Sequence, residues 1–500
     1  MIYKETIFSK NNLPLPVFNT GKPMHSKYNP AQEMPVISCE NEETLTEGFF
    51  LVMGIGAGYH IKNLLEKIQD KLQSYCIVAV EADSESLEYC RQFPIIKELS
   101  ALKTIAFCTK DNLTSILLQN YIPSKYGNFF LVPQRAWQNE NSADCTMIEL
   151  IVKETLKNIS NDYSVQAHFG KLWMSNIMSN LMTFTKNPTL QANIKLTAAV
   201  IAAGPSLDSS IEILKQNRQS YCIIATDTTY GTLIQSDISP DFVVSVDAQQ
   251  VSVTHFLKCP DAHDSIPTTF IFDICTNPAV PVYVQSKGHS VFFIQSGHPL
   301  ACLASKTAHL PYIETGAGTV TIACCDIARL LRFNRIELFG ADFSYSKGKP
   351  YTKGTYLETL YISSATRLMP QETKLSALMY RTPLIKKSDS CNDRTFTSDV
   401  LQRYEHTLEE WADMHGYAKK KCNQTCLLTH ASAQKEVLPG SANEFSFKNF
   451  MHTWIEGLKD NKYEETLLPY MAFLQHKKNK NISFFELYNL AYTKAIRYNR

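Results

Sequence analysis

Two segments of the chain share the pattern of a buried strand, a glycine turn and a helix, and this pattern limits the possible folds most. The first, AAVIAAGPSLDSSIEILKQ, begins at Ala198, and the second, ETGAGTVTIACCDIARLLRFNRIELFGADFSY, begins at Glu314. In the first, the opening apolar run predicts a strand, Gly204-Pro205-Ser206 a sharp turn, and the later apolar spacing a helix. Free N–H groups and a serine hydroxyl at a helix N-terminus favour a phosphate, so the two segments predict the two halves of one anion pocket.

The composition excludes several classes of protein. The 500 residues are enough for about three domains. The 49 basic and 48 acidic residues nearly cancel, so no global field attracts nucleic acid or an acidic membrane surface. No secretory segment opens the chain, the 14 cysteines lack the partner spacing of a zinc site, and no apolar run reaches the ~18 residues that cross a bilayer. We therefore expect a cytoplasmic protein without membrane insertion and without metal-ligand residues.

The order of patterns along the chain predicts three domains. Residues 1–165 read as an irregular arm over a Rossmann-like domain, with strands in FFLVM, CIVAVEAD, ALKTIAF and NFFLVP. A helical stretch over 147–186, broken near Gly170, leads into a central domain over 166–390. Amphipathic patterns such as VLQRYEHTLEEWADMHGY predict a helical C-terminal domain over 391–500.

In the central domain six apolar segments alternate with helical patterns: TAAVIAAG, SYCIIATD, DFVVSVD, TTFIFDI, SVFFIQS and RIELFGAD. This alternation is typical of a largely parallel sheet with helices on both faces. The fold class is therefore α/β in both the N-terminal and the central domain.

A separate glycine loop lies in the N-terminal domain, where Gly54, Gly56 and Gly58 follow a strand and Glu81 ends the next one. One interpretation is a Rossmann-type adenosine site, in which the carboxylate accepts ribose hydroxyls. The other is a tight turn that needs glycine with nothing bound. We expect His60, just beyond the loop, to be a residue at the start of a helix.

Carboxylates recur where the central strands end, at Asp227, Asp247, Asp273 and Asp342. Ligands of open parallel sheets bind outside the carboxyl ends of the strands, so these acids are predicted to share one rim. They could bind sugar hydroxyls, act as a general base, hold Mg²⁺ against a diphosphate, or cap helices. Gly318-Thr319 opens a helix predicted over 320–331, where backbone donors can hold a phosphate or a carboxylate.

The loop FSYSKGKPYTKGTY follows Asp342 and contains Tyr345, Lys347, Lys349 and Tyr351. Tyrosine hydroxyls can stabilise a departing phosphate and lysines can neutralise it. Its place beside Asp342 favours a lid over the site rather than an ordinary solvated surface.

At these residues the chain resembles the motility-accessory-factor flagellin glycosyltransferases. The central domain of that family is itself similar to archaeal 6-hydroxymethylpterin diphosphokinase and to the sialyltransferases of glycosyltransferase family 42. GIGAGYH with VEAD, then IAAGPSLD, PDFVVSVD, GAGTV and LFGADFSYSKGKPYTKGT, follow in the order of that family and cover most of 45–435.

The resemblance implies a glycosyltransferase that passes a nonulosonic, sialic-acid-like sugar from a CMP-activated donor to serine or threonine of flagellin. A sialyltransferase-like central domain would bind the donor, and no cofactor would be required, although a divalent metal is possible. Flagellin and the CMP-sugar would be the partners, in support of motility. The nucleotide would contact Gly204, Pro205, Ser206 and Leu207. From their places at strand ends, at a helix start and in the loop after Asp342, we further expect Asp227, Gly318, Thr319 and Tyr345 to bind the donor and Asp247, Asp342 and Tyr351 to be catalytic.

Some positions depart from the sialyltransferase pattern. Ala203 stands where those enzymes have Asn, and Asp227 lies near another donor-contacting Asn. Their catalytic histidine follows the Gly-x-Asp strand, whereas the next histidine here after His309 is His406. The catalytic base therefore stays open between Asp247, Asp342, His289 and His298.

Two alternatives stay open for function. A diphosphokinase would pass diphosphate from ATP to a pterin alcohol, with Asp227, Asp247 or Asp342 holding Mg²⁺. A non-catalytic flagellin-binding factor would bind flagellin tightly without nucleotide turnover.

Overall fold

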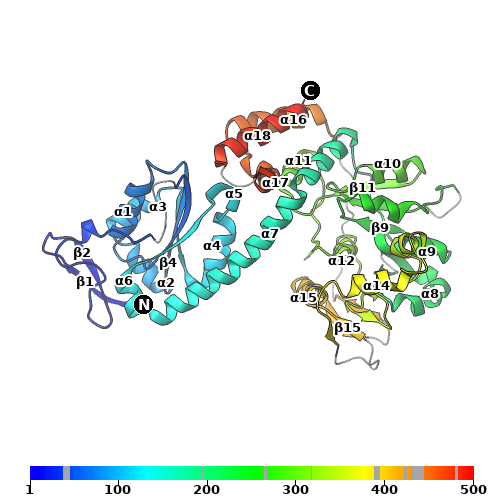
Figure 1. Ribbon diagram of the computed structural model, residues 1–500, viewed down its shortest axis with the longest axis horizontal. Helices are drawn as coiled ribbons and strands as arrows, with labels where there is room; N and C mark the ends of the chain where they lie inside the picture. The colour runs from blue at the N-terminus through cyan, green and yellow to red at the C-terminus, as the bar shows by residue number, and fades with distance from the viewer. Residues whose placement is uncertain are drawn as a thin grey trace. The chain divides into compact units, whose positions relative to one another are not determined.

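The computed structural model describes residues 1–37, 45–193, 196–263, 267–316, 318–387, 395–421, 425–430, 444–478 and 482–499. The chain divides into two compact units (Figure 1). The first unit comprises Met1–Lys171 with Leu467–Arg497, and the second Leu172–Thr466 with Tyr498–Arg500. Both units are α/β with parallel sheets, as the strand and helix patterns predicted. The boundaries expected at 165 and 390 stay predictions.

The first unit contains a four-stranded parallel sheet of order β5-β4-β3-β6. Its strands are β3 (Glu47–Met53), β4 (Ser74–Glu81), β5 (Ile105–Thr109) and β6 (Phe129–Pro133), in the four segments predicted. The chain moves from β3 to β4 and β5 on one side and then returns to place β6 on the other side of β3. The neighbours β3 and β6 therefore form the topological switch point of this sheet.

The helices of the first unit cover this sheet. They are η1 (Pro30–Gln32), α1 (Tyr59–Ile68), α2 (Ser84–Cys90), α3 (Pro94–Ser100), η3 (Lys110–Asn112), α4 (Leu113–Asn120), α5 (Pro123–Tyr126), α6 (Arg135–Glu140), η6 (Glu464–Leu467), α17 (Leu468–Lys478) and α18 (Phe484–Arg497), with η6 at the junction of the two units. Strands β3 and β4 are buried almost throughout, because both faces of a parallel sheet carry helices.

The expectation of an irregular N-terminal arm was wrong in part. Strands β1 (Tyr3–Phe8) and β2 (Pro14–Phe18) pair antiparallel as a hairpin. Tyr3 and Phe18 stack with ring centroids 5.4 Å apart, and both are buried. Aromatic cross-strand packing of this kind stabilises a hairpin whose sequence shows little periodicity.

The break expected near Gly170 was also wrong, since α7 (Ser142–Thr183) runs through it without interruption. A side chain at Gly170 would overlap the backbone carbonyl of Pro469 in α17. This glycine permits close packing of two helices rather than ending one.

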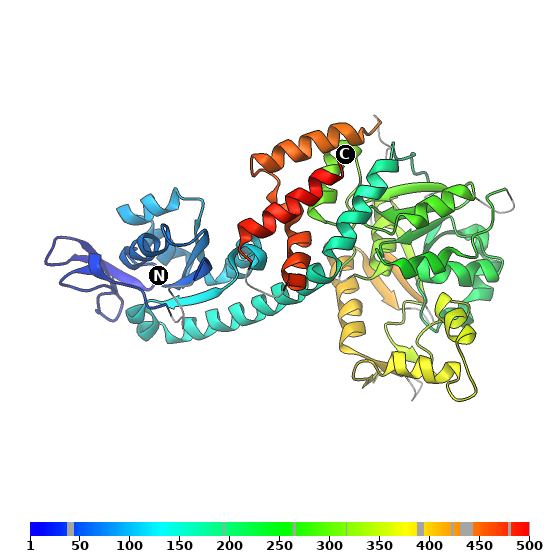
Figure 2. The same cartoon turned by 45° about the horizontal axis from the view of Figure 1, so that its top comes forward.

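The second unit is built on an eight-stranded sheet of order β11-β10-β9-β8-β7-β12-β17-β16. In Figure 2 the green strands of this sheet lie among the helices of the unit. The six predicted segments form its parallel part: β7 (Thr197–Ile201), β8 (Tyr221–Thr226), β9 (Phe242–Ser245), β10 (Thr269–Asp273), β11 (Ser290–Ile294) and β12 (Arg335–Phe339). Strands β8 to β11 extend the sheet on one side of β7, and β12 lies on the other. The switch point of this sheet is therefore between β7 and β12.

The helices of the second unit follow its strands. They are α8 (Leu207–Gln216), η4 (Arg218–Ser220), α9 (Asp227–Gln235), η5 (Gln250–Phe256), α10 (Ala279–Ser286), α11 (Pro299–Ala308), α12 (Val320–Leu330), α13 (Tyr356–Ser363), α14 (Gln371–Met379), α15 (Asp399–Met414) and α16 (Phe447–Lys459). Alternate residues of the central strands, such as Ala198 and Val200, share one core with the buried face of α12 and with Trp411 of α15. Right-handed crossovers place α8, α9 and α10 on the opposite face.

The C-terminal segment is mostly helical, as expected, but it also contributes strands that the sequence did not indicate. The hairpin of β16 (Ala418–Lys421) and β17 (Thr425–Thr429) extends the large sheet antiparallel to β12. A small second sheet joins β13 (Tyr345–Ser346), β14 (Ile385–Lys386) and β15 (Thr395–Thr397). Pairing with the distant strand β12 stabilises the hairpin, so the local sequence pattern of the hairpin does not predict it.

In the parts of the chain that the structure describes, no helix has both the length and the apolar character needed to span a bilayer.

Candidate functional site

The turn after β7 and the turn after β12 meet at the switch point of the large sheet. The N–H of Gly204 donates to the carbonyl of Gly340 over 2.7 Å, and the N–H of Ala202 donates to Phe339 over 2.8 Å. A side chain at Gly204 would overlap the Gly340 carbonyl and come within 2.6 Å of Asp342 Oδ2, and one at Gly340 would overlap the Ala202 carbonyl. Both glycines are thus needed for the two turns to approach each other. Ligands of open α/β sheets bind in this position.

Ser206 and Asp342 form a direct pair at this crevice. The Ser206 N–H donates to Asp342 Oδ2 over 2.7 Å, and the Ser206 hydroxyl donates to Asp342 Oδ1. Burial raises the pKa of Asp342, although the bonds from Ser206 and the charge of Lys387 oppose that rise. A carboxylate therefore takes the donors of α8 that the sequence assigned to a phosphate, and a ligand phosphate must displace it or bind elsewhere.

Leu207 lies inside the turn that follows Gly204. Leu207 is fully buried, and its N–H closes the turn by donating to the Gly204 carbonyl over 3.1 Å. Leu207 therefore holds the turn in place, and its buried side chain is not exposed to a ligand.

The loop after Asp342 lies across the start of α8 and the second half of α9. The N–H of Thr352 donates to the Ala203 carbonyl over 2.9 Å. Asp208, in the first turn of α8, accepts from Thr352 Oγ1 over 2.5 Å, from the Lys353 N–H over 3.0 Å and from Lys349 Nζ over 3.1 Å. Thr232 of α9 donates to the Lys353 carbonyl over 2.8 Å. The loop is anchored over the crevice, in the place expected of a lid.

Two of the predicted carboxylates are held by neighbouring hydroxyl and N–H groups. Asp227 is buried and accepts from Ser245 Oγ and from the Thr228 N–H, both over 2.6 Å. Asp247 is half-buried and accepts from Ser252 Oγ over 2.7 Å and from the Gln249 N–H over 3.0 Å. Among the described residues these acids and Asp342 do not converge into a group of three metal ligands. Each is an oriented single carboxylate.

Tyr356 connects Asp227 and Asp247 to a cavity. Partial burial raises the pKa of Tyr356, and the hydroxyl of Tyr361 and the charges of both acids raise it further. The cavity has a volume of about 230 Å³ and is lined by Thr228, Gly231, His255, Lys258, Tyr356 and Thr359, among others. It opens beside the carboxyl ends of β8 and β9, where the acids end their strands.

His255 is the residue of this cavity that the sequence analysis missed. Its ring centroid lies 4.2 Å from that of Tyr356, it is 8% exposed, and its Nδ1 is buried without a hydrogen-bond partner. The sequence held one weak signal for it, a histidine in the segment that follows Asp247 at a strand end. Its distance from the Gly-x-Asp strand concealed its position.

The lid tyrosines gather above the same region. Desolvation, together with the hydroxyls of Tyr345, Tyr356, Tyr404 and Tyr361, raises the pKa of Tyr351 to about 12, although 37% of the residue is exposed. Tyr345 and Tyr356 thus act electrostatically on Tyr351, as Asp227 and Asp247 act on Tyr356. Protonated hydroxyls of this kind are hydrogen-bond donors at neutral pH.

The helix predicted after Gly318 is present as α12, with Thr319 as its N-cap residue. Gly318 has φ of +91° and open space around it, while a side chain at Gly316 would lie 2.6 Å from Ile322; Ala317 is outside the described residues. Asp227 lies close enough to Cys324 in this helix to raise the pKa of that buried thiol further. No hydrogen bond among the described residues joins Gly318 or Thr319 to the rest of the site.

Two histidines considered as bases have structural partners. His289 Nε2 lies 2.9 Å from the Pro260 carbonyl, and its Nδ1 accepts from the Thr268 N–H over 3.4 Å. His298 caps α11 by accepting the Leu300 N–H at Nδ1 over 3.2 Å, and burial lowers its pKa to about 4. Asp273 is fully buried, accepts the Cys275 N–H over 2.6 Å, and has its pKa raised by that burial.

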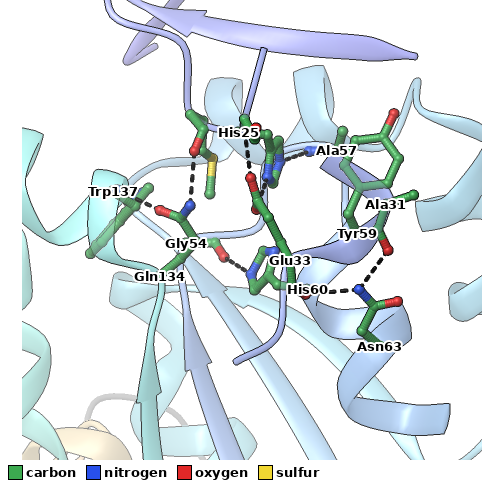
Figure 3. A network of polar contacts seen from close by, with 12 residues as sticks. His25, Ala31, Glu33, Gly54, Ala57, Tyr59, His60, Asn63, Gln134 and Trp137 are labelled. Atoms are coloured by element: carbon green, nitrogen blue, oxygen red, sulfur yellow. Dashed lines mark hydrogen bonds and ion pairs between the residues drawn. The ribbon is translucent and has the colours of Figure 1, made fainter. Parts of the chain in front are cut away.

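In the first unit the crevice beside Gly54 is filled by the chain itself (Figure 3). A side chain at Gly54 would overlap the ring of Trp137, and one at Gly56 would overlap Met24 Sδ and lie 2.6 Å from His25 Nε2. The N–H of Ala57 donates to His25 Nε2 over 3.0 Å. The structure thus agrees with the interpretation of these glycines as a turn required by packing.

Glu81 is not available to ribose hydroxyls. It is fully buried and accepts from Trp137 Nε1 over 2.6 Å and, over 3.0 to 3.1 Å, from the Tyr3 hydroxyl and the N–H groups of Ile55 and Ala82. Its pKa is raised by burial, which outweighs these four donors. The adenosine-site interpretation of Gly54 and Glu81 is therefore wrong for this conformation, because protein groups occupy both halves of that site.

Comparison with known proteins adds a family match over the second unit. Residues 174–348 match the family model described as 6-hydroxymethylpterin diphosphokinase MptE-like. An uncharacterized protein of Treponema pallidum (strain Nichols) is 35% identical over 157 residues, which are 30% of this chain and 74% of that protein. A second one from the same organism is 29% identical over 254 residues, which are 49% of this chain and 81% of that protein.

A solved structure, described as the MAf glycosyltransferase from Magnetospirillum magneticum AMB-1, is similar over 99% of this chain and 86% of that chain. The TM-score is 0.49 and the sequence identity 12%. The family match covers both turns of the crevice, from the strand before Gly204 to the loop after Asp342.

Proposed function

We propose that this chain, which belongs to the family of proteins with an MptE-like domain, is a glycosyltransferase that moves a nonulosonic sugar from a CMP-activated donor to serine or threonine hydroxyls of flagellin. Donor class and acceptor come from the resemblance of the motifs GPSLD, GAGTV and LFGADFSYSKGKPYTKGT to the motility-accessory-factor family. The fold positions these motifs around one rim of one sheet.

The observation that carries the proposal is the convergence at the switch point between β7 and β12. The Gly204 turn, the Gly340 turn and the anchored loop over Asp208 meet there, and the cavity with Tyr356 and His255 lies beside the neighbouring strand ends. A nucleotide with a bulky sugar needs such a crevice with an adjoining cavity, and its hydroxyls need oriented acceptors such as Asp227 and Asp247.

The transfer step makes modest chemical demands on the protein. An acceptor hydroxyl attacks the anomeric carbon in line, the bond to the CMP phosphate oxygen breaks, and the configuration inverts. The protein must position the groups, remove one proton and stabilise the leaving phosphate.

Each task has a candidate among the described residues. Asp342, whose pKa is raised by burial, suits the removal of a proton at neutral pH, and Asp247 is the second candidate. The hydroxyls of Tyr345 and Tyr351 and the start of α12 at Thr319 suit the departing phosphate. We propose that no divalent ion is required, because Asp227, Asp247 and Asp342 each accept hydrogen bonds from protein donors and do not converge on one point.

The test uses the purified full chain with flagellin and CMP-nonulosonate. We expect CMP release together with a mass increase of flagellin by whole sugar units, measured by intact mass spectrometry and unaffected by EDTA. An unchanged mass and no CMP, with donor integrity confirmed, would sink the transferase proposal. Tight flagellin binding in that case would favour a non-catalytic binding factor.

The second candidate is a diphosphokinase, favoured by the description of the matching family model. It would pass diphosphate from ATP to a pterin alcohol and would depend on Mg²⁺. The single, protein-bonded carboxylates argue against it, because a magnesium diphosphate needs converging oxygen ligands. AMP formation from ATP that requires both the pterin alcohol and Mg²⁺ would decide in its favour.

A further inference from the structure

The first unit contains a second cavity, of about 420 Å³, at the carboxyl ends of β3 and β6. This is the switch point of the smaller sheet, where ligands of open α/β sheets bind. The lining includes His25, Glu33, His60, Gln134 and Arg135, with apolar walls from the arm and from β6. None of these residues belongs to the transfer site proposed above.

His60, which lines this cavity, has a ring nitrogen without a hydrogen-bond partner. Its Nε2 lies 2.9 Å from the Gly54 carbonyl, to which it donates, so the proton resides on Nε2 and Nδ1 carries the lone pair. The residue is 3% exposed, and Nδ1 is buried without a hydrogen-bond partner. A buried acceptor without a donor is costly unless something binds to it.

Glu33 supplies an oriented carboxylate beside His60. Its Oε2 accepts from His25 Nδ1 over 2.8 Å and its Oε1 from the Ser26 N–H over 2.5 Å. Burial acts to raise the pKa of Glu33, but the bonds from His25 and Ser26 outweigh it and lower the pKa, so the group is ionised. Because Ala57 donates to His25 Nε2, the proton of His25 is fixed on Nδ1, where it holds Glu33.

One ligand atom from each of His25, Glu33 and His60 lies within 4.8 Å of the others, and Figure 3 shows the three side chains grouped beside Gly54. The arm that carries Glu33 is attached to α1 by Asn63, whose Nδ2 donates to the carbonyls of Ala31 and Glu33 over 2.8 Å each. The group is therefore built from two parts of the chain that are fastened together.

We propose that His60 Nδ1 and the Glu33 carboxylate bind a divalent transition-metal ion, with Zn²⁺ the best fit, and that the remaining coordination positions face the cavity. The hydrogen bonds match the pattern around metal ligands. The N–H at Nε2 of His60 donates to a backbone carbonyl, and the Glu33 carboxylate accepts from His25. An imidazole with a carboxylate suits Zn²⁺ or Mn²⁺ better than the oxygen-preferring Mg²⁺ and Ca²⁺. His25 is a positioning residue, because both of its nitrogens are already engaged.

The test titrates the full chain with Zn²⁺ by calorimetry and with Co²⁺ by visible absorption. We expect one site that is lost in Glu33→Gln and in His60→Gln. The replacement His25→Asn, which keeps a donor toward Glu33, should retain binding, whereas His25→Ala should weaken it about 10- to 100-fold. The exposed His263, replaced by Gln, is the matched control and should leave the titration unchanged.

The 14 cysteines can bind Zn²⁺ elsewhere, so the measured quantity is the difference between the wild type and each variant. Equal binding in wild type, Glu33→Gln and His60→Gln, or no site with a Kd below about 100 µM, would overturn the proposal. If His60→Gln fails to fold, Glu33→Gln decides alone, because it keeps the size of the side chain. Sugar transfer is not a readout here, so the outcome is independent of the proposed function.

Discussion

The two units place the same sequence pattern at the same topological position, yet they use it differently. In each, a glycine turn ends a strand beside the switch point of a parallel sheet. At Gly54 the space next to the turn is taken by Trp137, Met24 and His25. At Gly204 it is taken by a second turn of the same sheet, with the carboxylate of Asp342 at its centre.

This difference shows that a glycine loop indicates a close contact between its backbone and another group, but it does not indicate which group makes that contact. Around Gly54 the buried Glu81 is surrounded by protein donors, which stabilise the fold and leave its carboxylate unavailable to ribose hydroxyls. Around Gly204 the hydrogen-bonded residues Ser206 and Asp342 are half-buried, and a cavity opens one strand away. We therefore assign structure to the first turn and chemistry to the second.

The largest effect is expected from removing the pair at the second turn. The double variant Ser206→Ala with Asp342→Ala should lower sugar transfer at least about 10³-fold, because it removes a candidate base and an oriented donor together. Circular dichroism should show an unchanged fold. The pair Asp111→Ala with Ser115→Ala, at exposed positions of the first unit, is the control and should transfer at the wild-type rate. Full activity in the first variant would place the pocket elsewhere.

A smaller loss is expected from Gly204→Ala. The new methyl group would overlap the Gly340 carbonyl and lie 2.6 Å from Asp342 Oδ2, so the two turns must separate. A displacement near 1 Å can reduce a rate about 10²-fold. Gly348→Ala, in open space at φ of +74°, controls for a glycine lost from the same region. Equal rates for both variants would mean that contact between the turns is irrelevant to transfer.

The first turn should respond in stability rather than activity. Trp137→Phe removes the indole donor to Glu81 at a fully buried position, at a cost of about 1 to 3 kcal/mol in the free energy of unfolding. Hydrogen exchange should accelerate in β3 and in the Gly54 turn, while transfer at 25 °C stays within about twofold of wild type. A selective loss of transfer with unchanged exchange would contradict the structural role of this turn.

Most of the fold was predictable from local pattern. All ten strands expected in the two parallel sheets are present, because buried strands between glycine turns and amphipathic helices have a strong local signal. The hairpin β1-β2 was missed because its sequence shows little periodicity. The hairpin β16-β17 was missed, since pairing with the distant strand β12 stabilises it. Gly170 was misread for a related reason, because the carbonyl of Pro469 that requires it lies far away in the sequence.

The sequence indicated which residues follow the strand ends and glycine turns of the second unit, but it did not indicate which groups those residues contact. Asp227 and Asp247 follow the ends of β8 and β9, and Tyr345 and Tyr351 belong to the loop anchored over the crevice, as expected, while their roles stay predictions. The capture of the Ser206 donors by Asp342 was not predictable, because it depends on how two turns face each other. His255 had only a weak signal, its place in the segment after Asp247, since the packing of η5 against α9 brings it to the cavity.

The smallest expected effect is a pH-dependent change in stability, which tests whether His298 has a structural role, in contrast to His255. Although His298 is only half-buried as a residue, its ring Nε2 is inaccessible, and burial lowers its pKa from 6.5 to about 4. Between these pH values the unfolded chain binds a proton that the folded chain does not. The unfolding free energy of the second unit should therefore fall with decreasing pH, by at most about 1.4 kcal/mol per pH unit from this group.

Urea unfolding of wild type and His298→Asn between pH 4 and pH 8 measures this contribution, since Asn keeps the helix cap without titrating. The stability difference between the two proteins should be constant above pH 6.5 and should shift against the wild type below it. Parallel profiles would mean that His298 takes up a proton freely in the folded state. It would then regain its place among the candidate bases, and the distinction between a capping histidine and the unpartnered His255 beside Tyr356 would lose its physical basis.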